Sequence, residues 1–399
     1  MDLEYGARYE RERETIRRFL GEHWTGPAPD DTDERNERVR RFRERATRAG
    51  YLYRSVPVRY GGSEQPADPL LAQVIREEFL RVGAPLEIQG VGTSMLVPTL
   101  LECGQDWQKE RFVPGTIRGD DRWAQGYSEP GAGSDLASLR TRAELVDGEW
   151  ILHGHKIWTS LAQECQYMFA LVRTEPEAPR HAGISYLLLE LDQPGVEIRP
   201  LKQITGEEHF NEVFFDGART PADWIVGERG QGWRVSRTTL EHERSMIGGA
   251  SEALFRSLLR LARRSRIDGR PALEHPEIRQ DLAALQGRVW AQRYSSYYQM
   301  SCGLHERDPG ILRLMNKLLA TGIGHDVARV ALDLIGDRSL LAPSGPAGRA
   351  AGDERWMNQF MGSLGTAIAG GTSNIQRNII AERGLGLPRD RVAARDEGG

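Results

Sequence analysis

The sequence has few cysteines, no long apolar run and no basic excess, and each shortage excludes a class of protein. The three cysteines, Cys103, Cys165 and Cys302, are far apart and form no CxxC pair, so we expect reduced, buried thiols in a cytoplasmic protein. No stretch approaches the roughly 18 apolar residues of a membrane-spanning helix, and the charged N-terminus shows no signal peptide. A net charge of −4 argues against a nucleic-acid-binding surface.

Lysine is also scarce. Of 53 basic residues only four are lysines, namely Lys109, Lys156, Lys202 and Lys317. Such a bias towards arginine is typical of codon composition, and by itself it predicts no function.

The pattern of the 399 residues changes twice along the chain. Residues 1–122 have helical periodicity, with charged stretches over 9–19 and 33–49 followed by helical segments over 67–82 and 97–101. Residues 123–232 alternate short β-rich runs with Gly, Pro and Asp turns, as in a barrel or sandwich; the expected strands are 149–152, 167–173, 184–191, 196–201, 212–215 and 224–226. Residues 233–399 predict four long helices and hence a bundle, over 233–266, 276–304, 309–335 and 354–384.

The segment 125–135 reads Gln-Gly-Tyr-Ser-Glu-Pro-Gly-Ala-Gly-Ser-Asp and opens the strand-rich region. Its proline fixes a turn, and its glycines let backbone N–H groups and serine hydroxyls approach a flat polar ligand. On composition alone a surface turn is the commoner explanation. The pair Gly131-x-Gly133 lacks the third glycine and the strand-turn-helix context of a dinucleotide-binding motif.

The segment 154–160 reads Gly-His-Lys-Ile-Trp-Thr-Ser. Trp158 offers a ring to pack on a planar cofactor, and Ser160 offers a donor for the ring nitrogens of that cofactor. Taken alone, a core tryptophan beside a satisfied serine is more common. His153 and His155 have no visible third ligand, so no metal site is expected.

Together and in this order, the two segments resemble the acyl-CoA dehydrogenase family. Further matches follow in sequence over 211–216, 230–233 and 371–377, so the resemblance covers essentially the whole chain. It implies an α+β multidomain fold with an N-terminal α-helical domain over 1–122, a central β-barrel-like domain over 123–232 and a C-terminal four-helix bundle over 233–399. It also implies FAD, with the flavin ring between the β domain and the bundle.

The resemblance also assigns site residues. Positions along FAD are matched by Gln125, Tyr127, Ser128, Trp158, Ser160, Thr372 and Asn374. Ser134 matches a position that contacts the pantetheine part of coenzyme A.

Oxidation of the Cα–Cβ bond of a thioester needs a base for the α-proton, while a hydride leaves Cβ for the flavin. A carboxylate whose pKa is raised by an apolar site suits this task. In many relatives a Glu immediately before the Gly-Thr of the C-terminal motif is the base, but here that position is Gly370. A second group of relatives has a Glu before an Arg on the first bundle helix, which corresponds to Glu243-Arg244.

The helical pattern gives Glu243 independent support. It lies three residues after Leu240 and four before Ile247, on the apolar stripe of the expected helix. An ion pair with a neighbouring helix, with Arg244 as an adjacent cation, is the alternative role. Gly370 can still donate its backbone N–H to the enolate oxygen of the substrate.

The sequence departs from the family pattern in three motifs. Where many relatives carry an Arg and a Phe that reach FAD of a neighbouring subunit, this chain has Ser265 and Asp268, with Arg264 or Arg266 as substitutes. A Gly-Gly pair is replaced by Gly336-Asp337. Asn374 stands where a longer polar residue is usual.

Four functions stay open on the sequence. These are a dehydrogenase that passes electrons to an electron-transfer flavoprotein or similar acceptor, a flavin oxidase, a non-catalytic subunit that completes the site of a sister chain, and a purely helical scaffold. The family implies a homodimer or homotetramer, and the third function implies a heteromer. Acyl chain length is not readable, although Gly248 and Gly249 suggest room for a bulky or branched acyl group.

Overall fold

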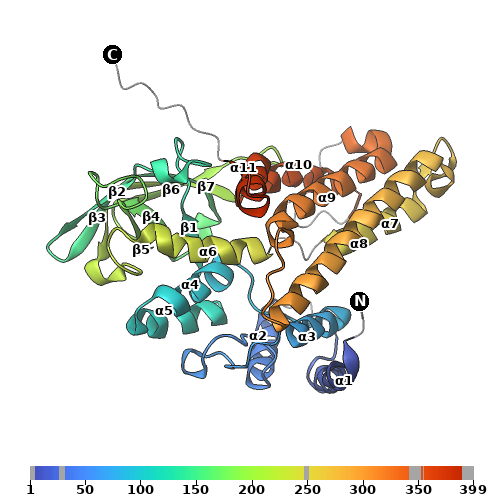
Figure 1. The fold of residues 1–399 in the computed structure, drawn as a ribbon, viewed down its shortest axis with the longest axis horizontal. Helices are drawn as coiled ribbons and strands as arrows, with labels where there is room; N and C mark the ends of the chain where they lie inside the picture. The colour runs from blue at the N-terminus through green and yellow to red at the C-terminus, as the bar shows by residue number, and fades with distance from the viewer. Residues whose placement is uncertain (1–4, 27–31, 247–250, 341–351, 354, 389–399) are drawn as a thin grey trace, which may run out of the picture. The chain divides into compact units, whose positions relative to one another are not determined.

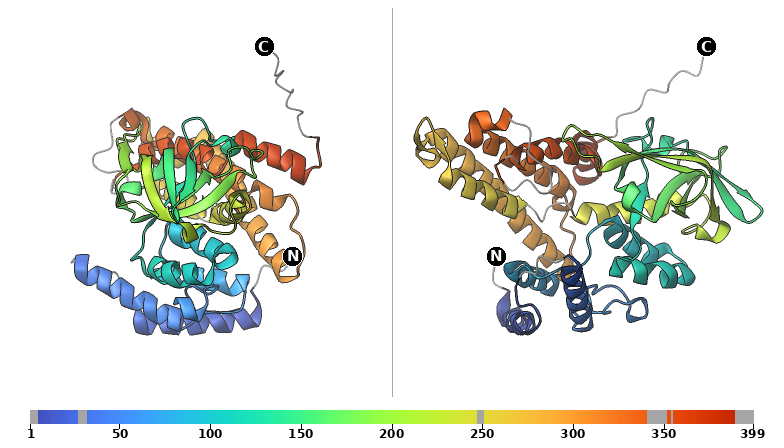
Figure 2. Two further views of the ribbon diagram at one scale, coloured as in Figure 1. Left: turned by 90° about the vertical axis from the view of Figure 1, so that its left-hand side faces the viewer. Right: turned by 180° about the vertical axis from the view of Figure 1, so that it is seen from behind.

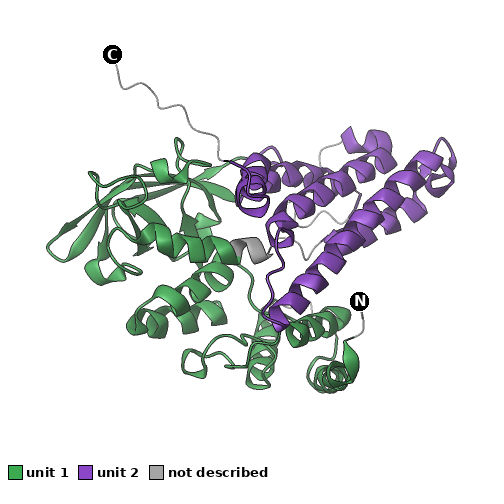
Figure 3. Cartoon of the chain, in the orientation of Figure 1, with its two compact units in different colours: residues 1–202, 208–243 green, residues 203–207, 244–399 purple. Residues whose placement is uncertain are grey.

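The computed structural model describes residues 5–26, 32–246, 251–340, 352–353 and 355–388, and of residues 243–246 it describes only the backbone. The chain forms two compact units, Met1–Lys202 with Glu208–Glu243, and Gln203–Glu207 with Arg244–Gly399 (Figure 3). Each unit is described by itself.

The first unit begins with helices. Their bounds are α1 (Gly6–His23), α2 (Thr32–Arg48), α3 (Pro69–Val82), α4 (Val97–Cys103) and α5 (Asp106–Arg118), with a 3-10 turn at Val58–Tyr60 and a π-type turn at Gly92–Leu96. Helix α3 illustrates how the sequence sets such bounds. The Asp68 carboxylate accepts a hydrogen bond from Leu71 N at 3.0 Å, and Pro69 occupies the first turn, where no N–H is needed. Gly83, at φ 66°, ends the helix in the left-handed conformation.

A buried carboxylate holds α1 against α3. Only 2 % of the Glu78 side chain is exposed, and it accepts hydrogen bonds from Arg13, Arg17 and Arg81 at 2.7–2.9 Å. Burial raises the pKa of Glu78, but the three guanidinium groups outweigh burial and lower that pKa to about 2. Glu78 is therefore an ionised group at neutral pH that fixes the relative position of the two helices.

The second part of this unit is a seven-stranded sheet (Figure 1). Its strands are β1 (Trp123–Gly126), β2 (Arg142–Val146), β3 (Glu149–Ser160), β4 (Tyr167–Arg173), β5 (Ile184–Glu190), β6 (Val196–Leu201) and β7 (Phe210–Pro221). The order is β1-β4-β2-β3-β7-β6, with β5 paired to β4; β1 and β2 are parallel to β4, and the other pairs are antiparallel. Helix α6 (Gly232–Met246) follows the sheet.

Strands β4 and β5 are buried on both faces. Along β4, Phe169 and Leu171 pack with the apolar side chains of the N-terminal helices, whereas Met168 and Ala170 pack with those of β2, β3 and β7. This double burial explains the unbroken apolar run of β4, which contrasts with the alternating pattern of β7. Both faces of the sheet are therefore covered at β4 and β5, on one side by the N-terminal helices and on the other by β2, β3 and β7.

The second unit is a helical domain. Its helices are α7 (Ser251–Arg264), α8 (Pro276–Leu304), α9 (Leu312–Ile335), α10 (Arg355–Ile368) and α11 (Ser373–Ile379), with a short hairpin of β8 (Arg266–Ile267) and β9 (Arg270–Pro271) after α7. Helices α7, α8, α9 and α10 share one apolar core, centred on side chains such as Leu258, Val327 and Trp356. Helices α8 and α9 lie side by side in the views of Figures 1 and 2. These observations confirm the helix–β–helix architecture expected from the sequence.

The expected elements need four corrections. Residues 354–384 are not one helix, because α10 ends at Ile368 and α11 begins at Ser373, with Gly370 at φ 63° and Gly371 at φ 97° between them. Residues 224–226 are not a strand; a 3-10 turn spans Ala222–Trp224, and Ile225 makes only an isolated bridge to Leu187. Strands β1 and β2 and helix α5 escaped prediction. The expected strands 149–152 and 212–215 are the beginning and the middle of the longer β3 and β7.

The three cysteines are unpaired thiols, but only Cys302 is buried, whereas Cys103 and Cys165 are partly exposed. Burial and the neighbouring Glu164 raise the pKa of the Cys165 thiol to about 11. No helix within the described ranges is long and apolar enough to cross a membrane. In the same ranges no three His, Cys, Asp or Glu side chains are grouped so that they could hold a metal ion.

Candidate functional site

The loop after β1 is a tight turn closed by its own backbone. Glu129 and Ala132 exchange two hydrogen bonds of 3.0 Å across Pro130 and Gly131, and Ser128 O accepts from Ile157 N at 2.9 Å. The hydrogen bond between Ser128 and Ile157 attaches the loop to β3. The two segments singled out in the sequence, 125–135 and 154–160, therefore lie side by side.

A buried ion pair fixes this junction. Lys156 is fully buried, and its ammonium donates to the Glu129 carboxylate at 2.8 Å and to Tyr127 O at 3.2 Å. The Glu129 carboxylate also accepts from the backbone N–H groups of Arg140 (2.6 Å) and Thr141 (2.9 Å). One carboxylate thus ties together the turn, β3 and the start of β2.

The electrostatics of the pair follow from its burial. Burial raises the pKa of Glu129, but the Lys156 charge and the hydrogen bonds from Lys156, Thr141 and Arg140 outweigh it, so the pKa lies below its ordinary value. Burial lowers the pKa of Lys156, and Glu129 offsets only part of that effect. The pair is a structural one that positions backbone rather than a proton donor for chemistry.

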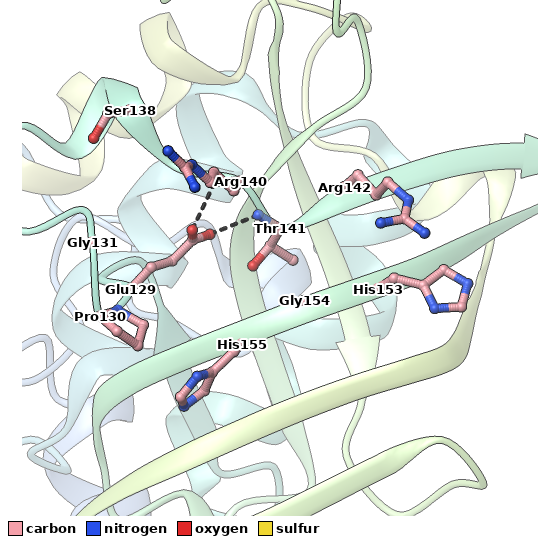
Figure 4. A pocket seen from close by; sticks show the side chains of 10 residues that line it. All are labelled: Glu129, Pro130, Gly131, Ser138, Arg140, Thr141, Arg142, His153, Gly154 and His155. Carbon is pink, nitrogen blue, oxygen red and sulfur yellow. Dashed lines mark hydrogen bonds between the residues drawn. The ribbon is translucent and has the colours of Figure 1, made fainter.

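A pocket of about 480 Å³ opens beside this junction (Figure 4). The Glu129 carboxylate lies on one wall, and basic side chains from the following loop and from β2 and β3 line the rest. Three of these basic groups face carboxylates already, as in Arg142 with Glu144 (3.6 Å), His153 with Asp216 (3.4 Å) and His155 with Glu212 (3.0 Å). The two histidines carry a charge only when protonated, and no carboxylate among the described residues pairs with the Arg140 guanidinium.

Trp158 has an unusual backbone conformation for a tryptophan. It lies at φ 61°, on a bulge where the register between β3 and β7 shifts between Lys156 and Thr159, and 59 % of the residue is exposed. The Phe210 ring meets it edge-on, with the ring centroids 6.0 Å apart. A left-handed conformation costs a non-glycine residue free energy and tends to mark functional sites. A large exposed ring held in this way is well placed to cover a planar ligand.

Tyr127 is more deeply buried than the other expected FAD residues of this unit. Its ring is 5 % exposed and packs edge-on against Phe169 and Tyr186. Tyr186 is fully buried; burial and the neighbouring Tyr127 raise its pKa well above the ordinary value. The Tyr127 ring is therefore part of the core of this unit, and its place along FAD stays a prediction.

Hydroxyl groups fix helix α6 against the same core. Thr239 Oγ1 lies 2.9 Å from Thr99 Oγ1 of α4 and donates to Tyr186 Oη at 3.5 Å. Ser236 and Thr239 are completely buried, so this face of α6 is directed into the unit.

The remaining expected positions of the first unit lie near the junction. Gln125 is a partly buried residue of β1 paired with Phe169, Ser128 is partly exposed, and Ser160 is exposed at the end of β3. Ser134 is exposed in the loop, next to Asp135, whose carboxylate pairs with Arg180 at 2.5 Å. The structure thus brings Gln125, Ser128, Trp158 and Ser160 to neighbouring backbone segments.

In the second unit, the expected residues lie around the break between α10 and α11. We call residues Ala369–Thr372 the glycine turn. Thr372 is the N-cap of α11, and its hydroxyl accepts from Ile375 N at 3.3 Å. Asn374 is exposed, and its side-chain oxygen accepts from Arg377 at 3.3 Å. Among the described residues, no acceptor pairs with the N–H of Gly370 or Gly371. Two successive free amides in this conformation form a concave site that suits an oxyanion.

Two buried side chains that escaped prediction hold the glycine turn. The Lys317 ammonium of α9 donates to Ala367 O (3.3 Å) and to Gly371 O. The Gln376 amide donates to Gly370 O (3.2 Å) and to Gly371 O (3.5 Å). The signal available in the sequence was the scarcity of lysine, since Lys156 and Lys317 are the two lysines that the structure buries.

The departures from the family pattern can be located. Ser265 is buried and donates to Leu261 O at 3.0 Å, while Asp268 has φ 51° in the β8–β9 hairpin. Arg264 pairs with Asp353, and Arg266 donates to Gly269 O, so both arginines already have partners. Gly336 ends α9, and Asp337 lies in the following 3-10 turn.

The expected base lies at the edge of the described residues. Glu243 and Arg244 belong to the last turns of α6, but their side chains lie outside what the structure describes. Gly248 and Gly249 lie outside it altogether. The helix itself is described, and Glu243 follows Ser236 by seven residues and Thr239 by four, which places its Cα on the same face as those buried residues.

Comparison with known proteins gives one consistent result. The chain matches the family models for the N-terminal, middle and C-terminal domains of acyl-CoA dehydrogenases over residues 8–120, 124–218 and 230–385. It is 40% identical over 358 residues to the acyl-CoA dehydrogenase IpdE1 of Mycobacterium tuberculosis, which covers 89% of each chain.

Two solved structures share the fold. The Tcur3481-Tcur3483 steroid ACAD has a TM-score of 0.75 at 29% identity, covering 98% of this chain and 100% of the other. The ChsE4-ChsE5 complex from Mycobacterium tuberculosis has a TM-score of 0.76 at 26% identity, covering 98% and 100%. With three domain models in order, a close relative over most of the length and the two motif segments side by side, the chain belongs to the acyl-CoA dehydrogenase family of FAD-dependent oxidoreductases.

Proposed function

We propose that this acyl-CoA dehydrogenase oxidises the Cα–Cβ bond of its thioester to the trans-2-enoyl-CoA, with Glu243 as the base that removes the α-proton. The observation that carries the assignment of the base is the position of Glu243 on α6. It continues the face of Ser236 and Thr239, which are completely buried. The reaction requires a carboxylate in an apolar site, because low polarity raises the pKa of a carboxyl group towards that of a useful general base.

The residues present fit FAD. Trp158, exposed and held in a strained conformation on the β3 bulge, offers a flat aromatic surface on which part of an isoalloxazine ring can pack. Ser160 lies two residues further on and supplies a hydroxyl at the strand end. FAD, when bound, supplies the acceptor for the hydride that leaves Cβ. The chain's own contribution here is to fix the end of β3 that carries Trp158 and Ser160, and the buried Lys156–Glu129 pair does this by joining β3 to the loop after β1.

The glycine turn supplies the second requirement of the reaction. As the α-proton leaves, negative charge develops on the thioester oxygen, and donors already in position lower the barrier. The N–H groups of Gly370 and Gly371 have no acceptor among the described residues. We assign them to the enolate oxygen, a role that a glycine fills as well as the glutamate of other family members.

The test uses Glu243→Gln with Glu241→Gln as the matched control, because Glu241 is exposed on the same helix. Each FAD-loaded protein is mixed anaerobically with a panel of acyl-CoAs, and flavin bleaching is followed. We expect Glu243→Gln to retain FAD and to slow bleaching by roughly 100-fold or more, the size of effect of general base catalysis, with Glu241→Gln unchanged. Near-normal bleaching in Glu243→Gln would reject the base.

A second candidate is a subunit that completes the site of a sister chain. Gly370 in place of a glutamate favours it, and two similar structures are each named after two chains. The same experiment separates the two functions, since a purely partner subunit would not bleach with any acyl-CoA until a second chain is added. Peroxide release in air, without an electron-transfer flavoprotein, would instead identify an oxidase.

For the acyl group we propose a bulky, polycyclic substrate of the steroid class. The support is the likeness, at 29% identity over nearly the whole chain, to a structure named as a steroid ACAD. Within the acyl-CoA panel, steroid side-chain thioesters should bleach the flavin at lower concentration than straight-chain thioesters of any length. Preference for a straight chain would reject this substrate class.

A further inference from the structure

Lysine is rare in this chain, yet two of its four lysines are almost completely enclosed. Lys156 is 0 % exposed and Lys317 is 3 % exposed, and the ammonium of each donates to main-chain carbonyls of a segment assigned to the site. An ammonium is compact and directs three donors, whereas a guanidinium is planar and larger, so arginine cannot replace lysine in a small cage of carbonyl oxygens. The two buried lysines therefore mark positions where the shape of the donor matters.

We propose that Lys317, together with Gln376, is a positioning residue that holds the glycine turn so that the N–H groups of Gly370 and Gly371 face the substrate oxygen. This inference rests on the proposed function, because it assigns a purpose to the same two amides.

The contacts constrain the turn from both sides. Lys317, on α9, reaches the end of α10 through Ala367 O and the turn itself through Gly371 O. Gln376, on α11 and 3 % exposed, reaches Gly370 O and Gly371 O. The glycine turn follows α10 and is thus held by side chains of two further helices, α9 and α11.

The acceptors that these side chains occupy determine where the amides point. Gly370 C=O and Gly371 N–H belong to one peptide group, so the Gln376 amide, which holds that carbonyl, also fixes the direction of the Gly371 N–H, while Lys317 holds the carbonyls of Ala367 and Gly371 on either side of this peptide group. The Gln376 amide also polarises the peptide and strengthens the N–H as a donor. With φ at 63° and 97°, only glycine adopts this turn without strain, and a Cβ on Gly371 would lie 2.7 Å from the Gln376 amide nitrogen.

Packing alone does not require an ammonium at this position. Burying a charged group is unfavourable unless hydrogen bonds compensate for the lost hydration, and an apolar side chain of similar length would fill the same space without that cost. The polar end of Lys317 is therefore retained for the carbonyls that it holds.

The experiment compares Lys317→Met with Lys109→Met, a partly exposed lysine of α5 outside the site. The readouts are FAD content, kcat and KM with the best acyl-CoA, and binding of the corresponding 3-thia-acyl-CoA. That analogue can lose its α-proton but has no β-hydrogen to transfer, so the long-wavelength band of its enolate beside the flavin reports α-proton acidity directly. The pH midpoint of this band is the readout that a merely structural role would leave unmoved.

We expect Lys317→Met to keep FAD and to change KM less than about 3-fold. It should lower kcat roughly 10- to 100-fold, because complete loss of a single oxyanion donor lowers kcat about 100- to 1000-fold and this variant only loosens the donors. It should also raise the pH midpoint of the enolate band by about one unit or more. Lys109→Met should match the parent. A folded Lys317→Met protein with parental kcat and midpoint would overturn the inference.

Two further outcomes are decisive. Should Lys317→Met fail to fold, Gln376→Met removes the other donor of the clamp, and the same loss of kcat and shift of the midpoint is expected; parental values there would overturn the inference too. A parent protein that neither bleaches nor forms the enolate band would reject the proposed function, and the positioning role with it.

Discussion

Removing the ammonium of Lys156 should destabilise the first unit by about 3 kcal/mol. Lys156→Met keeps the length of the side chain but leaves the Glu129 carboxylate, 8 % exposed, without its cation. Breaking a buried pair from one side costs about 3–5 kcal/mol, and the hydrogen bonds from Arg140 N and Thr141 N to the same carboxylate favour the lower end. For a domain of 150–250 residues this lowers the unfolding midpoint by roughly 6–12 °C, at about 2–4 °C per kcal/mol.

The assay is thermal unfolding of the FAD-loaded protein at pH 7, followed by circular dichroism. Glu129→Gln and the double variant complete a cycle, in which the double variant should cost about 2 kcal/mol less than the sum of the single changes. The exposed pair Arg219–Glu149 serves as the control, because Arg219→Met should cost no more than about 1 kcal/mol.

The reasoning fails if Lys156→Met and Arg219→Met shift the midpoint equally, or if the two changes at the buried pair are simply additive. The pH dependence gives a second check. Because the pKa of Glu129 lies below its ordinary value in the folded protein, the stability from the pair is present above the ordinary pKa of a glutamate and is lost as pH falls through the folded value. Glu129→Gln should remove that acid sensitivity.

Two other expectations follow from the first unit. Glu78 has a pKa of about 2 against an ordinary 4.5, so about 3 kcal/mol of folding stability should be present above pH 4.5 and disappear as pH falls towards 2. Acid unfolding of the parent and of Glu78→Gln measures this contribution. Equal acid sensitivity of the two proteins would contradict the prediction. Trp158→Ala should weaken FAD binding roughly 10-fold, while the unfolding midpoint of the apoprotein stays within a few degrees because the ring is mostly exposed. Titration of apoprotein with FAD tests it, with Trp158→Phe as the variant that should retain most of the affinity.

Helices and strands could be predicted from the sequence wherever the apolar pattern was long and characteristic residues marked its ends. The expected helix 276–304 and strand 167–173 coincide with α8 and β4, because a proline begins the first and a fully buried apolar run forms the second. The prediction of one helix over 354–384 was wrong at one place. The pair Gly370-Gly371 interrupts α10 and α11 with two positive φ angles, and apolar periodicity continues on either side of such a break.

The site could be predicted only where the family pattern names it. The partners of Lys156 and Lys317 lie far away in sequence, at Glu129 and Gly371, and only the folded backbone brings them together. Nothing in a one-dimensional pattern separates a buried ammonium from a solvated one. The bulge at Trp158 was invisible for the same reason, since it is a property of the pairing of β3 with β7.

That bulge limits how the chain can vary in length. The bulge sets Ile157 and Trp158 opposite the single residue Glu212 of β7, so deletion of either would restore one-to-one pairing and remove the left-handed conformation that exposes the Trp158 ring. An insertion in the β2–β3 hairpin turn at Asp147–Gly148, where both residues are exposed, would leave the far end of β3 in place. In descendants of this sequence, length changes should therefore accumulate at the hairpin tip and be absent from the two residues of the bulge.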